Sequence, residues 1–419
     1  MALRPGDVQL AIVHVSDLHC GESPADEILE GAVADLRSEA LAAGGGRSEI
    51  SAIEDLASLL PGAGKAQEQE VALLSIAIDS RLQSICDGEN VPIACVVSGD
   101  LTRWGRRSEF RNAHRVITSR TETVTTRFHQ DTRAAGLGFA SSARIPGNHD
   151  HFAGDSLALQ DLLLRPCRRN AVIHTYGELG FHPSGARDPG GAAWGPVDLA
   201  TRDEDLCVRL LGVDSNSGYA DRSQEDFDFG TEARLAPELP AWLVEAALAP
   251  CAQARCMRAL LHHHPLHAVN FATARSDVIA LRNCCIEADI AAIFSGHEHR
   301  FHVGEIGLSR DGMRIRSFMA PSALQLASVV ALVRHVESSL TRISSTSARL
   351  ERAIQSLVRV LKPRAECGAL IHVIGWRDAR RVELQWDVHW VSLGNAARVL
   401  IAAKNGHVES IFYPMRGSG

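Results

Sequence analysis

Short apolar runs that end abruptly at Asp, Asn or His recur along this chain. Runs of this length and composition are typical of buried strands. The polar groups that follow them are Asp17 with His19, Asp100, Asn148 with His149, Asp214-Ser215-Asn216, His262-His263-His264, and His297 with His299. In layered α/β proteins, chemistry gathers at the carboxyl ends of strands. The spacing therefore predicts that these side chains share one site.

The residue types in this set favour a metal centre. Carboxylates combined with imidazoles suit Mn, Fe or Zn better than Mg or Ca, which prefer oxygen ligands. Side chains alternate on extended backbone, so Asp17 and His19 are expected to point the same way, as are His297 and His299. Glycines that would allow sharp turns stand directly before candidate ligands or ligand pairs. They are Gly99, Gly147 and Gly296.

The order of these motifs resembles that of the calcineurin-like metallophosphoesterase superfamily. That family has D-x-H, GD, GNH followed by an acidic residue, a histidine shortly before proline, and GHxH. The matching blocks here are Asp17-Leu18-His19, Gly99-Asp100, Gly147-Asn148-His149-Asp150, His263-His264-Pro265 and Gly296-His297-Glu298-His299. The stretch from Asp214-Ser215-Asn216 through Gly230 to Leu239-Pro240-Ala241-Trp242-Leu243 is similar to the cyclic-nucleotide-phosphodiesterase-like branch.

The resemblance implies two metal ions, of Mn, Fe or Zn. Asp100 would bridge both ions. The other assigned ligands are Asp17, His19 and His299 for the first ion, and Asn148, His263 and His297 for the second. His263 is selected from three adjacent histidines because the family ligand precedes proline by two positions. His262 and His264 would point elsewhere, or one of them would contact substrate.

The implied reaction is hydrolysis of phosphate diesters or monoesters, with a small nucleotide-like substrate. A metal-bound hydroxide would attack phosphorus, and His149 would assist the leaving group. The segment after the GD block is expected to be an exposed loop, and Arg103 in it is the best candidate for a further substrate contact. Two alternatives stay open: a DNA or RNA nuclease of the same superfamily, and a non-enzymatic binding scaffold.

Composition narrows the class of protein. The chain has 419 residues, 45% hydrophobic and 22% charged, which excludes a largely disordered chain. The formal net charge of −7 argues weakly against nucleic acid as the partner. No signal peptide and no run of about 18–20 apolar residues is present, and the ten cysteines form no CxxC pair. We therefore expect a cytoplasmic protein with no membrane partner.

The expected fold is α/β, and the resemblance implies a four-layer αββα sandwich. Residues 1–325 would form the catalytic domain, with a helical insertion at about 25–87. Residues 326–419 would form a C-terminal α+β addition, a long helix followed by strands at Ala369–Trp376, Val382–Val391 and Val408–Tyr413. Residues 185–196 are expected to be a loop.

The predicted long helix carries a heptad-like stripe at residues 336–361. Its members are Val336, Leu340, Ile343, Ser347, Leu350, Ile354, Leu357 and Leu361. Such a stripe is typical of a helix packed on its own domain, which we favour. The alternative is a homo-oligomer formed through residues 329–361.

Overall fold

The computed structural model describes most of the chain. The described residues are 2–20, 63–102, 105–125, 130–139, 142–151, 178–179, 192–218, 233–269, 272, 274–324, 367–378, 380–392 and 406–414. They form a mixed α/β fold with two six-stranded sheets and one two-stranded sheet. The stripe at 336–361, most of the predicted insertion and Arg103 lie outside these residues.

The first sheet has the strand order β14-β13-β12-β1-β2-β5. Its strands are β1 (Val8–Val15), β2 (Ile93–Val97), β5 (Ala143–Arg144), β12 (Gly368–Trp376), β13 (Glu383–Ser392) and β14 (Gly406–Pro414). Strands β1, β2 and β5 are parallel, so their carboxyl ends lie at one edge. All eight residues of β1 are buried, which explains why its sequence is almost continuously apolar.

The second sheet has the order β10-β11-β9-β8-β7-β6. Its strands are β6 (Ala193–Ala200), β7 (Leu206–Val213), β8 (Arg255–Leu261), β9 (Ile290–Ser295), β10 (His302–Leu308) and β11 (Arg314–Met319). Strands β7, β8 and β9 are parallel. Strand β6 begins at Ala193, inside the segment expected to be a loop, and that expectation is therefore wrong for residues 193–196.

An apolar core lies between the two large sheets. It joins Leu10 and Ile12 of β1 to Leu210 of β7 and Phe294 of β9. Across it, the rings of Phe318 and Trp386 stack with centroids 5.8 Å apart. Burying such large aromatic side chains is a main source of the free energy that holds the sheets together.

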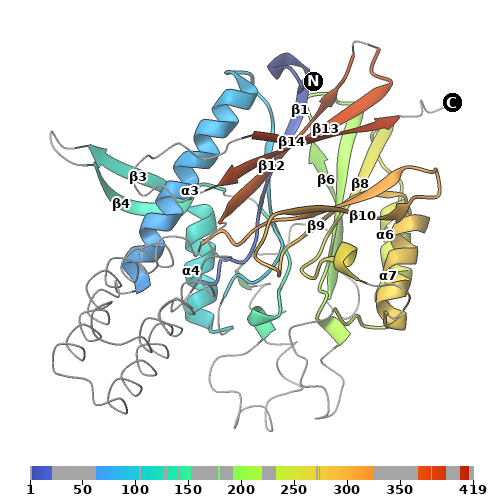
Figure 1. Ribbon diagram of the computed structural model, residues 1–419, viewed down its shortest axis with the longest axis horizontal. Coiled ribbons are helices and arrows are strands. Elements are labelled where there is room, and N and C mark those ends of the chain that lie inside the picture. Colours follow the sequence, from blue (N-terminus) through green and yellow to red (C-terminus); the bar gives the residue numbers. More distant parts are fainter. Residues whose placement is uncertain are drawn as a thin grey trace, which may run out of the picture.

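Helices cover the outward faces of the two sheets. Helices α3 (Ala63–Cys86) and α4 (Arg107–Thr118) share a core with β1, β2 and β12. Helices α6 (Leu239–Leu248) and α7 (Ser276–Glu287) share another with β7, β8 and β9. Figure 1 shows the two pairs on opposite sides of the strands. The C-terminal half of the expected insertion, α3, therefore packs on the first sheet.

The C-terminal strands do not form a separate unit. Strand β12 pairs antiparallel with β1, from Val8 opposite Gly375 to His14 opposite Leu370, and β13 and β14 follow. A boundary at residue 325 would divide one hydrogen-bonded sheet, so the expected separation of residues 326–419 is wrong for these strands. A hairpin of β3 (Arg120–Thr125) and β4 (Gln130–Leu137) was not predicted.

Among the described residues, no helix is both long and apolar enough to cross a membrane.

Candidate metal centre

The predicted site residues follow the carboxyl ends of parallel strands in both sheets. Asp17 and His19 come after β1, Asp100 after β2, and Asn148 and His149 after β5. In the second sheet, His263 comes after β8, and His297 and His299 after β9. Side chains from the two sheets contact one another here, as Asp100 does with His263. The edges at which these strands end therefore meet at one place.

Four of the predicted ligands form a compact cluster. Asp17, His19, Asp100 and His299 each place one ligand atom within 4.8 Å of the others. His299 Nε2 lies 3.2 Å from Asp17 Oδ1, and His19 Nε2 lies 3.8 Å from both Asp17 Oδ1 and Asp100 Oδ2. All but His299 are almost fully buried. This arrangement can hold a metal ion.

The other three predicted ligands lie beside this cluster. His263 Nε2 is 3.0 Å from Asn148 Oδ1, and His297 Nδ1 is 3.2 Å from the same oxygen. Asp100 Oδ2 is 3.3 Å from His263 Nε2. One Asp100 oxygen therefore lies close to imidazoles of both groups, which is the position that a bridging carboxylate needs.

The hydrogen bond of His263 to Ser98 prepares its other ring nitrogen as a ligand. His263 Nδ1 lies 2.7 Å from the Ser98 carbonyl oxygen, which can only accept, so Nδ1 donates. The neutral ring then presents a lone pair at Nε2, toward two oxygen acceptors. Backbone carbonyls commonly orient metal-binding histidines in this way. Ser98 was not predicted from the sequence, because a carbonyl partner leaves no side-chain signal.

The four imidazoles of the centre differ in protonation in the metal-free protein. The charge of Asp17 raises the pKa of His299 despite burial. Burial lowers the pKa of His19 and of His297 to about 4, so both rings are neutral near pH 7. Burial also acts to lower the pKa of His263, but Asp100 outweighs it and raises the value to about 9. In the metal-free protein, a proton on His263 therefore balances charge that a cation would otherwise balance. His263 and His149 hold the pKa of Asp100 well below its usual range despite burial.

The backbone at the ligands is unusual. Asp17, His19, Asp100, His297 and His299 all have positive φ, between 42° and 78°. Left-handed conformations are uncommon outside glycine and cost roughly 1–3 kcal/mol where strained. The expectation that extended backbone aligns the D-x-H and H-x-H pairs is therefore wrong. Tight left-handed turns aim these side chains instead.

The three glycines before the ligands are needed where loops approach one another closely. Gly99 has φ of 102°, which only glycine adopts readily. At Gly147 a Cβ atom would collide with the Asp100 carboxylate, and at Gly296 with Ser16 and Asp17. The sequence prediction of sharp turns thus holds for Gly99. At Gly147 and Gly296 the requirement is space.

The predicted catalytic residue, His149, also lies at the centre. Its ring meets the ring of His19 edge-on, with centroids 4.7 Å apart. Its backbone N–H donates to Asp100 Oδ1 at 2.9 Å. The side chain is only partly buried, unlike most of the ligand cluster. A partly exposed imidazole beside the cluster is placed to meet a ligand that arrives from solvent.

Asp150 holds two of these loops together, although we predicted no role for it beyond its place in the motif. Its carboxylate accepts from the backbone N–H groups of Leu101, Thr102 and Gly147 at 2.8–3.2 Å. Burial and the nearby charge of Asp100 raise the pKa of Asp150 to about 6. The acidic residue that follows GNH is thus a positioning residue.

The remaining two histidines of the triplet differ from one another. His262 is fully buried and its pKa is lowered to about 3 by burial. His264 Nδ1 pairs with Ser215 Oγ at 2.8 Å, and its ring lies 4.4 Å from that of His297. Ser215 belongs to the Asp214-Ser215-Asn216 group after β7, which the shared-site prediction included. That group therefore supports the centre through His264.

The residues present fit a cation by the chemistry of their donor atoms. Asp17 Oδ1 is buried without a hydrogen-bond partner, although two imidazole nitrogens lie within 3.8 Å of it. A cation bound between these nitrogen and oxygen atoms would supply the interaction that a hydrogen bond does not. The donor atoms of the cluster are carboxylate oxygens and imidazole nitrogens, which suit Mn, Fe or Zn.

The chain has only distant structural likenesses among known proteins. No family model matches the chain, and no curated protein matches it. A solved structure of GAP50, the anchor in the inner membrane complex of Plasmodium, superposes with a TM-score of 0.41 and 8% identity, over 96% of this chain and 90% of that one.

A second solved structure is the sulfate thiohydrolase SoxB of Thermus thermophilus in complex with glycerol. It superposes with a TM-score of 0.35 and 13% identity, over 77% of this chain. The superposition covers 53% of SoxB, so this chain spans about half of that protein. Both scores describe distant likenesses.

Proposed function

We propose that this protein is a metal-dependent phosphoesterase with a dinuclear centre. The observation that carries the proposal is the position of Asp100 Oδ2, which lies 3.8 Å from His19 Nε2 and 3.3 Å from His263 Nε2. In the proposed assignment, Asp17, His19 and His299 would hold one ion, Asn148, His263 and His297 would hold the other, and Asp100 would contribute to both.

Two bound ions would activate a water molecule and neutralise charge on a phosphoryl group. The chain's own residues would do the rest. The carboxylates of Asp17 and Asp100 bring negative charge that draws cations into the centre, and the carbonyl of Ser98 keeps His263 in its ligating tautomer. His149, partly exposed beside His19, would donate a proton to the leaving oxygen.

The proposed substrate is a small phosphate diester or monoester of nucleotide type. The motif resemblance supports this class. Three apolar cores lie between successive layers of helices, first sheet, second sheet and helices. This layering supports the further proposal of a four-layer αββα sandwich. The acidic net charge of −7 makes a long nucleic acid the weaker candidate.

One assay set tests the proposal. Purified protein with added Mn²⁺ is given bis-p-nitrophenyl phosphate, p-nitrophenyl phosphate, cyclic nucleotides and single-stranded DNA. Turnover of small esters that stops with a chelator is the expected result. DNA cleavage without small-ester turnover would identify a nuclease instead. No metal-dependent turnover on any substrate would identify a binding scaffold and contradict the proposal.

A further inference from the structure

Three cysteines and one aspartate gather at the edge of the second sheet opposite the candidate metal centre. Cys207 lies near the start of β7 and Cys256 near the start of β8. Cys251 lies in the segment between α6 and β8, and Asp198 lies on β6. His263 lies seven positions after Cys256, along β8 and the turn that follows it, or about 23 Å of extended chain. The two groups are therefore distinct.

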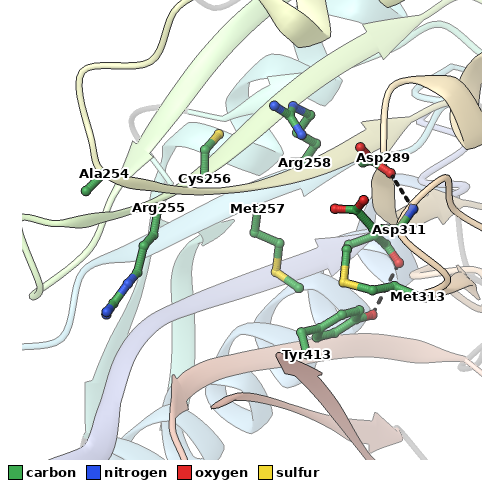
Figure 2. A pocket seen from close by; sticks show the side chains of 10 residues that line it. Ala254, Arg255, Cys256, Met257, Arg258, Asp289, Asp311, Met313 and Tyr413 are labelled. Carbon is green, nitrogen blue, oxygen red and sulfur yellow. Dashed lines mark hydrogen bonds between the residues drawn. The ribbon is translucent and has the colours of Figure 1, made fainter. Parts of the chain in front are cut away.

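Strand register brings these side chains to one face. Cys207 pairs with Cys256 across β7 and β8, Arg209 pairs with Arg258 two residues further on, and Asp198 pairs with Arg209 across β6 and β7. Residues two apart on a strand share a face. Figure 2 shows Cys256 and Arg258 on one side of β8, with Met257 on the other. Cys207, Cys256 and both arginines thus share the helix-covered face, and Cys251 contacts Cys207 from the segment before β8.

The distances fit one tetrahedral ion. Ligand atoms of Asp198, Cys207, Cys251 and Cys256 all lie within 4.8 Å of one another. Cys207 Sγ is 3.2 Å from Cys251 Sγ, and Cys251 Sγ is 3.8 Å from Asp198 Oδ2. Two sulfurs bound to zinc at about 2.3 Å each are at most about 4.6 Å apart, and about 3.8 Å apart at the tetrahedral angle.

The surroundings of the cluster favour a thiolate at Cys256, whereas its hydrogen bond to Cys256 and burial raise the pKa of Cys207. Arg209 Nε and Nη2 donate to the two Asp198 oxygens at 2.8 and 2.9 Å, so the carboxylate is held in place. The hydrogen bond from the Cys207 thiol, with Arg209 and Arg258 nearby, lowers the pKa of Cys256 to about 7 despite burial. Three thiolates and one carboxylate carry four negative charges, which one divalent ion and two guanidinium groups would balance.

We propose that Cys207, Cys251, Cys256 and Asp198 bind a structural Zn²⁺ ion, separate from the catalytic centre. Each thiol would lose its proton to solvent on binding, and the ion would tie β6, β7 and β8 to the segment before β8. Arg209 would orient the Asp198 carboxylate, as partners of metal ligands commonly do. Cys251 and Cys256 are only partly buried, so an ion can reach the sulfurs from solvent.

Cobalt substitution tests the site without relying on activity. The full chain is reduced, stripped with a chelator and titrated with Co²⁺, and the sulfur-to-cobalt charge-transfer absorption is followed. The candidate metal centre offers only nitrogen and oxygen, so cobalt bound there does not contribute to this band. One equivalent of band-forming Co²⁺ per chain is expected, displaced by Zn²⁺. A wild-type protein without the band would overturn the proposal.

Matched variants assign the ligands. Cys207→Ser and Cys256→Ser should each weaken or abolish the band, whereas Cys86→Ser, at the end of α3, should leave it unchanged. Circular dichroism checks that each variant is folded. If a variant fails to fold, the ligands are identified in the wild-type protein instead. Mass spectrometry then maps which thiols Zn²⁺ protects from alkylation. Protection absent from Cys207, Cys251 and Cys256, or a Cys207–Cys251 disulfide that persists under the reducing conditions, would overturn the site.

Discussion

Asp100 Oδ2 lies 3.3 Å from His263 Nε2, and this contact joins the two large sheets at their carboxyl edges. Asp100 follows β2 of the first sheet, and His263 follows β8 of the second. Both side chains are almost completely buried. A buried carboxylate and imidazole this close either share a proton or share a cation. The proposed dinuclear centre depends on the second possibility.

Replacing Asp100 with Ala should remove metal and activity together. The variant loses the carboxylate that would contact both ions, so we expect less than half of the wild-type metal content and turnover lowered at least ~10³-fold. Elemental analysis and the bis-p-nitrophenyl phosphate assay measure both. Asp205→Ala, an exposed aspartate in the turn before β7, serves as control and should behave as wild type. Full metal occupancy in Asp100→Ala would contradict the bridging role.

Replacing His149 with Ala should lower turnover without removing metal. The ring lies beside His19 but is not among the proposed ligands, so metal content should stay at the wild-type level. Loss of a positioned proton donor should lower kcat by ~10²–10⁴-fold. His114→Ala, on α4, is the matched control. Substrates whose leaving group needs no protonation should be affected less, and an equal loss for all leaving groups would argue against the proton-donor role.

The sequence predicted the strands better than the loops. The run from Val8 to Val15 and the run from Leu206 to Val213 coincide with β1 and β7, because strands buried on both faces are continuously apolar. Strand β6 was missed because Gly195 and Pro196 interrupt it. Strand β10 was missed because Gly304 and Gly307 interrupt its apolar pattern and only Ile306 is buried.

The sequence predicted which residues gather at the candidate site, but it did not predict their backbone geometry. The motif resemblance named the seven proposed ligands and His149, and the structure brings their side chains close together. The left-handed backbone at Asp17 and His19 could not be predicted. Both residues donate backbone hydrogen bonds to Gly99 and Asp100, about 80 residues away, and local sequence patterns do not show such contacts. The cysteine cluster was missed for a related reason: Cys207 and Cys256 meet only through strand register.

Replacing Gly147 with Ala should disturb the centre by a steric clash alone. A Cβ atom there would collide with the Asp100 side chain and backbone nitrogen, so the loop must shift and carry Asn148 with it. We expect metal affinity to fall ~10–100-fold, as for loss of a partner that orients a ligand. Gly6→Ala, where a Cβ atom would meet nothing within 4 Å, is the control. Isothermal titration with Mn²⁺ compares the two, and equal affinities would contradict the close-packing argument.

The alkylation of Cys256 should depend on pH near neutrality. Hydrogen bonding from Cys207 and the nearby arginines lower its pKa to about 7, against a usual value of 9.0, so the reactive thiolate dominates above pH 7 in metal-free protein. Burial raises the pKa of Cys86, which makes it the internal control. Iodoacetamide labelling, quantified by peptide mapping from pH 5.5 to 9.5, should give a half-maximal rate near pH 7 at Cys256. The rate at Cys86 should still be rising at the upper end of this range. A Cys256 profile that follows that of Cys86 would mean that Arg209 and Arg258 do not stabilise a thiolate there.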